Sequence, residues 1–307
     1  MSDLPAAVSL REVGPRDGLQ NEEPVSTAAK VELIDGLART GLTRIEAVSF
    51  VRASSIPQMA DAEQVWAAID HPSGVRFSAL VPNLRGAERA LAAGVEEIEV
   101  VVSASDTHNR RNVGRSTDDS LLDLERIVEL AHGRGATVSA IVATAWGCPY
   151  EGDLPIERVL DVAARALAGG ADSLSYGDTT GMATPGRVTR LIGQTRSAHP
   201  DTPLNLHFHN TRGTALANVL AALQLGVADF DASVGGLGGC PYAPGASGNV
   251  ATEELVHMVQ DMGVSTGVDL DALLEVAARA EQMVGRTLPS QVLRAGPRSR
   301  RADGAVE

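Results

Sequence analysis

Two histidines separated by one residue have the spacing in this chain that most clearly suggests chemistry. His207 and His209 lie in the segment 204–210, where they alternate with Leu206 and Phe208. In a β-strand successive side chains point to opposite faces, so both imidazoles would share one face. Such a pair binds divalent metal ions when a carboxylate or an amide completes the coordination shell. A pair of structural histidines is the alternative, and the spacing alone does not decide between the two.

The composition excludes several classes of protein. The chain has 307 residues, of which 44% are apolar, and its formal net charge is −13, so nucleic acid is not an expected partner. No apolar run approaches the roughly 18 residues that a membrane helix needs, and the N-terminus lacks the pattern of a signal peptide. We therefore expect a cytoplasmic protein with no membrane partner. Its two cysteines, Cys148 and Cys240, are expected to be free thiols.

Apolar, β-branched segments alternate with stretches of helical spacing along nearly the whole chain. Strands are predicted at 8–13, 44–50, 76–81, 97–103, 137–143, 173–176, 204–210 and 229–234. The first helix is predicted to begin at Ser26 or Thr27 and to end at Gly41. The other helices are predicted at 60–69, 83–93, 118–132, 155–167, 185–198, 214–225, 251–262 and 269–284. The segment 106–117 is expected to be a polar loop.

Strand and helix thus alternate eight times, which predicts an α/β protein with a single parallel (β/α)₈ barrel and one additional C-terminal helix. An open, doubly wound sheet is the alternative. It is disfavoured because the first strand is not followed by the glycine pattern of a dinucleotide site. We expect residues 1–294 to form the barrel and residues 295–307, which are rich in Arg and Gly, to form a disordered tail.

A barrel of this kind would bring distant polar residues together. Its active site lies at the carboxyl ends of the strands. The polar residues that lie in or just after the predicted strands are Arg16, Asp17, Glu46, Asp178, His207, His209, Cys240 and Asn249. One carboxylate, two imidazoles and one amide from this set suit a single divalent cation and leave room for a chelating substrate. A surface ion pair is the alternative interpretation of Arg16 and Asp17.

A glycine-rich segment precedes Cys240. Four of the five residues at 235–239 are glycine, which lets the backbone approach a ligand closely. A thiol with a pKa near ~8.5 is mostly protonated at neutral pH, so it can donate a proton to a carbanion. Arg16 offers a fixed cation that can stabilise an enolate or a carboxylate oxygen. For Cys148 a small buried side chain is as good an interpretation as a functional thiol.

The ordered motifs resemble those of the 3-hydroxy-3-methylglutaryl-CoA lyase family, whose members are metal-dependent barrels. The motifs span about residues 8 to 290 and comprise Gly14–Glu22, Ile45–Phe50, Pro57–Met59, Gly147–Gly152, Gly177–Thr179, His207–His209 and Gly235–Asn249. The resemblance implies cleavage of 3-hydroxy-3-methylglutaryl-CoA, an acyl-CoA thioester, to acetyl-CoA and acetoacetate. It also implies one Mg²⁺ or Mn²⁺ ion and a homodimer.

The resemblance also assigns roles to individual residues. The metal ligands at the matching motif positions are Asp17, His207, His209 and Asn249. Arg16 stabilises the enolate of the departing acetyl-CoA and, with Gln20, binds the substrate. Cys240 protonates the carbanion. Glu46 and Asp178 orient the substrate or take the proton of its hydroxyl, and His207 is a second candidate for that base.

Two positions depart from the family pattern. Asn210 stands where many relatives carry Asp, which predicts a weaker hydrogen bond to a metal ligand. Trp146 replaces a smaller apolar residue and is expected to reshape the acyl pocket. Because of Trp146, a lyase of the same mechanism that acts on another 3-hydroxyacyl-CoA is an alternative. A condensing synthase of the isopropylmalate type is disfavoured by the Cys240 segment, and a non-catalytic barrel is the remaining alternative. The segment 105–112 could bind the phosphates of CoA or form a solvated loop.

Overall fold

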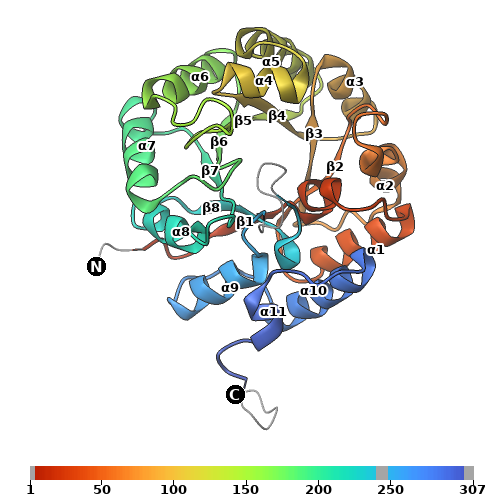
Figure 1. Cartoon of the computed structure of the whole chain (residues 1–307). Helices are drawn as coiled ribbons and strands as arrows, with labels where there is room; N and C mark the ends of the chain where they lie inside the picture. The colour runs from red at the N-terminus through yellow and green to blue at the C-terminus, as the bar shows by residue number, and fades with distance from the viewer. Residues whose placement is uncertain (1–3, 240–247, 301–307) are drawn as a thin grey trace.

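Eight parallel strands close into one barrel with helices around it (Figure 1). A computed structural model describes residues 4–239 and 248–300. Each strand pairs with its neighbour in sequence, and the eighth pairs with the first. The strands are β1 (Ser9–Glu12), β2 (Arg44–Ser49), β3 (Arg76–Val81), β4 (Glu97–Ser103), β5 (Thr137–Ala143), β6 (Ser173–Gly177), β7 (Leu204–His207) and β8 (Asp229–Ala232). The predicted (β/α)₈ barrel is therefore confirmed.

The seventh strand is shorter than predicted. β7 ends at His207, whereas the prediction continued it to residue 210. His209 instead forms an isolated antiparallel bridge with Asn249. The chain leaves the barrel sheet after His207 because the backbone there pairs with the segment that follows β8. Both histidines nevertheless lie on one side, with their ring centroids 5.1 Å apart.

The helices surround the barrel (Figure 1). They are α1 (Thr27–Ala38), α2 (Ala62–Ala68), α3 (Leu84–Ala92), α4 (Asp106–Val113), α5 (Thr117–His132), α6 (Ile156–Ala168), α7 (Pro185–Ala198), α8 (Ala215–Leu223), α9 (Thr252–Asp261), α10 (Leu270–Val284) and α11 (Gln291–Ala295). Of the additional helices at the C-terminus, α10 lies beside α1 and α11 lies against α9 and α10 (Figure 1). The side chain of Ser26 accepts a hydrogen bond from the N–H of Ala29, so Ser26 is the N-cap of α1, one of the two predicted. None of the helices in the described ranges is long and apolar enough to cross a membrane.

The predicted polar loop at 106–117 is wrong, because this segment begins with α4. The hydroxyl of Ser105 accepts the N–H of His108 at 3.0 Å, which caps the helix. Gly114, with φ +76°, ends it in the left-handed conformation. The helix buries the polar residues His108 and Asn109, so it carries no apolar periodicity that could have predicted it.

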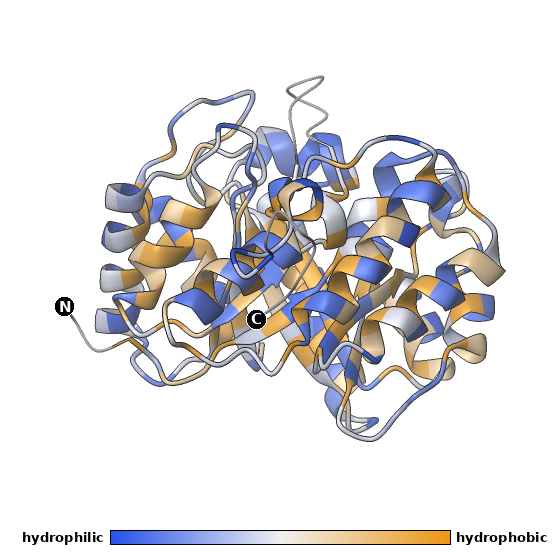
Figure 2. Ribbon diagram, turned by 90° about the horizontal axis from the view of Figure 1, so that it is seen from below, coloured by the Kyte–Doolittle hydropathy of each residue, from blue (hydrophilic) through white to orange (hydrophobic). Residues whose placement is uncertain are grey.

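The barrel has an apolar outer face and a polar interior. In the register of β1, β7 and β8, Leu10 and Leu206 lie beside Phe230 and belong to the core between barrel and helices. Figure 2 shows apolar residues along the central strands and hydrophilic ones on the outer sides of the helices. The residues that alternate with these along the strands point into the barrel, where Arg11 lies beside Asp231. Both are buried, so charged side chains fill the interior near the strand ends.

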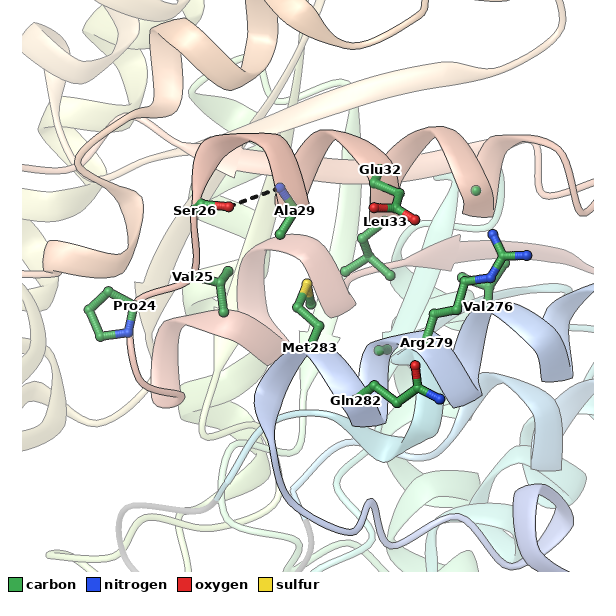
Figure 3. Close-up of a pocket in the computed structure, with 12 residues that line it drawn as sticks. Pro24, Val25, Ser26, Ala29, Glu32, Leu33, Val276, Arg279, Gln282 and Met283 are labelled. Carbon is green, nitrogen blue, oxygen red and sulfur yellow. Dashed lines mark hydrogen bonds between the residues drawn. The ribbon is translucent and has the colours of Figure 1, made fainter.

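Two further features lie away from the barrel interior. A cavity of about 530 Å³ lies between α1 and α10, which also contact each other, and its wall includes Val25, Leu33 and Met283 but none of the predicted site residues (Figure 3). The predicted domain boundary at residue 294 falls within α11. Beyond it, Arg298 forms an ion pair of 2.7 Å with Asp261. Residues 301–307 lie outside the described ranges, so the disordered tail stays a prediction.

Candidate active site

A short helical turn after β1, η1 (Gly14–Gly18), carries Arg16 and Asp17. Glu12, fully buried at the end of β1, holds this turn against β8. Its Oε1 accepts the N–H groups of Gly14 and Val234 at 2.7 and 2.8 Å, and its Oε2 accepts the hydroxyl of Thr252 at 2.6 Å. A Cβ at position 14 would lie 2.7 Å from Oε1, so only glycine permits this approach.

Arg16 is fixed between two carboxylates. Its Nη1 lies 2.7 Å from Oδ1 of Asp17, and its Nη2 lies 2.6 Å from Oε2 of Glu46 in β2. Burial raises the pKa of Glu46, and the guanidinium of Arg16 opposes that shift. Because both Nη atoms are engaged, the guanidinium has one defined orientation at the cavity wall.

Asp17 lies where the loop after β1 meets the segment after β8. Its Oδ1 also accepts the amide of Gln20 at 2.8 Å, and its Oδ2 accepts Nδ2 of Asn249 at 2.7 Å. Burial acts against ionisation, but Arg16 and the two imidazoles lower the pKa of Asp17 to about 2. Gly238, with φ +110°, makes room for the amide, since a Cβ there would lie 2.8 Å from Nδ2 of Asn249.

Asp17, His207 and His209 form a cluster in which the three candidate ligand atoms lie within 4.8 Å of one another. Burial and the neighbouring His207 lower the pKa of His209 to about 3, so its imidazole is neutral, as a ligand must be. Two polar atoms beside the cluster, Oδ1 of Asn249 and Nδ1 of His209, are buried and have no hydrogen-bond partner among the described residues. Buried acceptor atoms without a hydrogen-bond partner, on an amide and a neutral imidazole, fit a site that binds a cation.

A cavity of about 250 Å³ opens beside this cluster, at the carboxyl ends of the strands. Its polar wall includes Arg16, Asp17, Gln20, His207, His209, Asp231 and Thr179. The apolar part includes Val51, Leu80, Val101 and Ile141. From α4, which the sequence did not predict, His108, Asn112 and Val113 reach the same wall. The predicted residues of the strand ends therefore meet in one place.

The other predicted residues flank the cavity. Glu46 contacts Arg16, and Asn249 contacts Asp17. Glu46 and Asn249 therefore lie directly behind two residues of the cavity wall. Asp178 follows β6, and its Oδ1 accepts the N–H groups of Met182 and Ala183 at 2.8 and 3.0 Å. Burial raises the pKa of Asp178 to about 6. Cys240 lies outside the described residues.

Sequence reasoning missed Asp231 in β8. Its Oδ2 lies 3.1 Å from Nδ1 of His207, so it orients that ring. Burial works against its charge, but Arg11 and His207 hold the pKa of Asp231 well below its usual range. The available signal was that Asp231 lies in the middle of the predicted strand, two residues after Asp229 and therefore on the same face.

The two positions that depart from the family pattern, Trp146 and Asn210, do not line this cavity in the part of the chain that the structure describes. The carboxylate beside His207 comes from Asp231 and not from position 210. Oδ1 of Asn210 accepts the N–H of Ala215 at 3.3 Å, at the start of α8. Trp146 packs against Phe208 and Tyr176, with ring centroids 5.3 and 6.2 Å away, and is not part of the cavity wall.

Comparison with known proteins agrees with this geometry. A family model described as HMGL-like matches residues 7–279. The chain belongs to the HMGL-like family. It is 47% identical over 290 residues to a hydroxymethylglutaryl-CoA lyase of Bacillus subtilis, covering 94% of this chain and 97% of the relative. It is 43% identical over 302 residues to the (R)-citramalyl-CoA lyase of Chloroflexus aurantiacus, covering 95% of each.

One solved structure that is similar to this chain contains ligands. It is an HMG-CoA lyase of Acinetobacter baumannii in complex with coenzyme A and 3-methylmalate, 42% identical to this chain, with a TM-score of 0.92. The match covers 97% of this chain and 98% of that one. The resemblance noted from the sequence motifs is thus confirmed at the level of the family.

Substituting His207 and Arg16 separately tests which side chains hold a metal. We expect His207→Ala to weaken Mn²⁺ binding by roughly tenfold or more, because an imidazole ligand is lost. Arg16→Met should leave the Kd within about threefold, since a guanidinium has no lone pair to offer a metal. Calorimetric titration with Mn²⁺ measures both, and His199→Ala at the end of α7 is the histidine control. Equal weakening in His207→Ala and His199→Ala would contradict the assignment.

Proposed function

We propose that this chain is a divalent-metal-dependent lyase that cleaves 3-hydroxy-3-methylglutaryl-CoA to acetyl-CoA and acetoacetate. One observation carries the proposal: Asp17, His207 and His209 meet beside Arg16 in a single cavity, in a chain 47% identical to a lyase named for this substrate. The proposed partners are an acyl-CoA thioester, one Mg²⁺ or Mn²⁺ ion and a second copy of the chain, in the cytoplasm.

The reaction sets three chemical requirements. The substrate's 3-hydroxyl loses its proton, its oxygen becomes the ketone of acetoacetate, and the bond between C2 and C3 breaks. The electron pair of that bond passes to C2 of the departing acetyl-CoA, whose thioester oxygen takes up negative charge as an enolate. A proton then adds to C2. The site must therefore offer a base, a cation at the thioester oxygen and an acid.

The metal-binding residues are proposed to be Asp17, His207, His209 and Asn249. A bound Mg²⁺ or Mn²⁺ supplies a Lewis acid that polarises substrate oxygens. The low pKa of Asp17 and the neutral imidazole of His209 keep these donors in the form that binds a cation.

Asp178 is the residue to which we assign the base. It lies between Gly177 and Thr179 of the cavity wall, and its buried Oδ2 has no hydrogen-bond partner in the described ranges. Glu46 is engaged by Arg16, so it orients that cation and is a poorer base. His207 is held by Asp231 at Nδ1 and serves as a ligand through its other nitrogen.

Arg16 is assigned to the enolate oxygen, and Gln20 lines the same wall. The guanidinium is held in advance by Asp17 and Glu46, so it needs no reorganisation when the negative charge develops. Cys240 is assigned to the protonation of C2 on its chemistry alone, because a thiol is protonated near neutral pH.

The base assignment predicts a pH dependence. Asp178 must be ionised to accept a proton, and the groups that face it include His207 and Arg212. Because its pKa is about 6, kcat/KM should be constant above pH 7 and fall about tenfold per unit below pH 5.5. The profile is measured with Mn²⁺ at saturation at every pH, which separates loss of the base from loss of the metal. A profile that stays flat down to pH 5 would rule out Asp178.

Citramalyl-CoA is the second candidate substrate, because the chain is 43% identical to a lyase named for it. This thioester carries its hydroxyl at the same carbon but has one methylene fewer in its acid arm. A single methylene in a fitted pocket changes kcat/KM about 10- to 200-fold. We expect 3-hydroxy-3-methylglutaryl-CoA to be cleaved at least about tenfold more efficiently than (R)-citramalyl-CoA. If (R)-citramalyl-CoA is cleaved more efficiently, the shorter thioester is the substrate. If neither thioester is cleaved, the proposed function is wrong.

A further inference from the structure

Two buried charges inside the barrel, Arg11 and Glu99, have no part in the proposed chemistry. Arg11 of β1 is 1% exposed and Glu99 of β4 is fully buried, and the two form an ion pair. Removing a guanidinium and a carboxylate from water costs free energy that their attraction often fails to return. A gain in folding stability is therefore a weak explanation for burying this ion pair. The other contacts of Arg11 offer a better one.

Arg11 also holds Asp231 in a bidentate pair. Its Nε lies 2.8 Å from Oδ1 and its Nη2 lies 2.9 Å from Oδ2. The amide of Asn205 donates to Oδ1 at 2.8 Å, and His207 meets Oδ2 at 3.1 Å. A carboxylate has about four lone-pair sites, and all four are occupied here. The Asp231 carboxylate therefore cannot turn, and planar bidentate pairing by arginine supplies half of the restraint.

The restraint extends from Asp231 to the metal cluster. Because Nδ1 of His207 faces the carboxylate, Nε2 is the nitrogen left for the side where Asp17 and His209 lie. A carboxylate behind a ligating imidazole fixes both the ring orientation and the tautomer. The ring orientation thus depends on Asp231, and the orientation of Asp231 depends on Arg11.

We propose that Arg11, held on its far side by Glu99, is a positioning residue that fixes Asp231 and through it the ring of His207 for metal binding. This inference rests on the metal site of the proposed function. A purely structural role for the Arg11–Glu99 pair makes a different prediction, because its removal would then lower stability without changing metal affinity.

The test is the double variant Arg11→Met/Glu99→Gln in the full chain. The measurement is made at about pH 8, above the pKa of about 7 that burial gives Glu99, so that the variant removes one positive and one negative charge and leaves the net charge around the cluster unchanged. The matched control is Arg44→Met/Glu97→Gln, which removes the ion pair of 3.0 Å formed by the first residues of β2 and β4, at the opposite end of the barrel. Free Mn²⁺ is counted by electron paramagnetic resonance, at a temperature where circular dichroism shows each protein folded.

We expect the Kd for Mn²⁺ to rise about 10- to 100-fold in Arg11→Met/Glu99→Gln and to change less than about threefold in the control. An unchanged Kd in Arg11→Met/Glu99→Gln overturns the positioning role and leaves the proposed function intact. Absence of Mn²⁺ binding in the wild-type protein overturns both. If the double variant does not fold, Arg11→Lys replaces it, because lysine keeps the charge but cannot form the bidentate pair. A Kd equal to that of the wild type again overturns the inference.

Discussion

The carboxylate of Asp17 is the group on which the geometry of the site depends. It accepts hydrogen bonds from Arg16 and Gln20 of its own loop and from Asn249, which arrives from the far end of the chain. These contacts join the start of the barrel to its last strand, so the ring of strands and the site close at the same place. Glu12 makes a second connection of this kind, from β1 to the N–H of Val234 and the hydroxyl of Thr252. Closure of the barrel and assembly of the site are therefore one structural event.

Buried charge is the second constraint. Two guanidiniums, Arg11 and Arg16, pair with four carboxylates, those of Asp17, Glu46, Glu99 and Asp231. With all four ionised the set carries two surplus negative charges, which a divalent cation beside Asp17 would neutralise. Burial, which disfavours the ionised form, raises the pKa of Glu99 to about 7. This pairing of opposite charges explains how the polar interior of the barrel accommodates several buried ionisable groups.

Local sequence patterns predicted the parts of this arrangement that depend on local properties. The strands were visible as apolar runs, and the His207/His209 pair was visible because period-two alternation puts both rings on one face. α4 was missed because it buries His108 and Asn109, so its spacing carried no apolar signal. Asp231 was missed because its partners, His207 and Arg11, lie 24 and 220 residues away in the chain. Asp231 meets these partners only when the barrel is closed, so no local sequence pattern predicts the contacts.

The central claim is that the side chains of Asp17, His207, His209 and Asn249 together hold one divalent ion at the mouth of the barrel. Anomalous diffraction at the manganese edge, from crystals of the full chain grown with Mn²⁺, tests this most directly. We expect one strong peak, about 2.0–2.3 Å from the carboxylate, the two imidazoles and the amide oxygen of these residues. A peak that is bound by other residues, or a featureless map at this cluster, would contradict it.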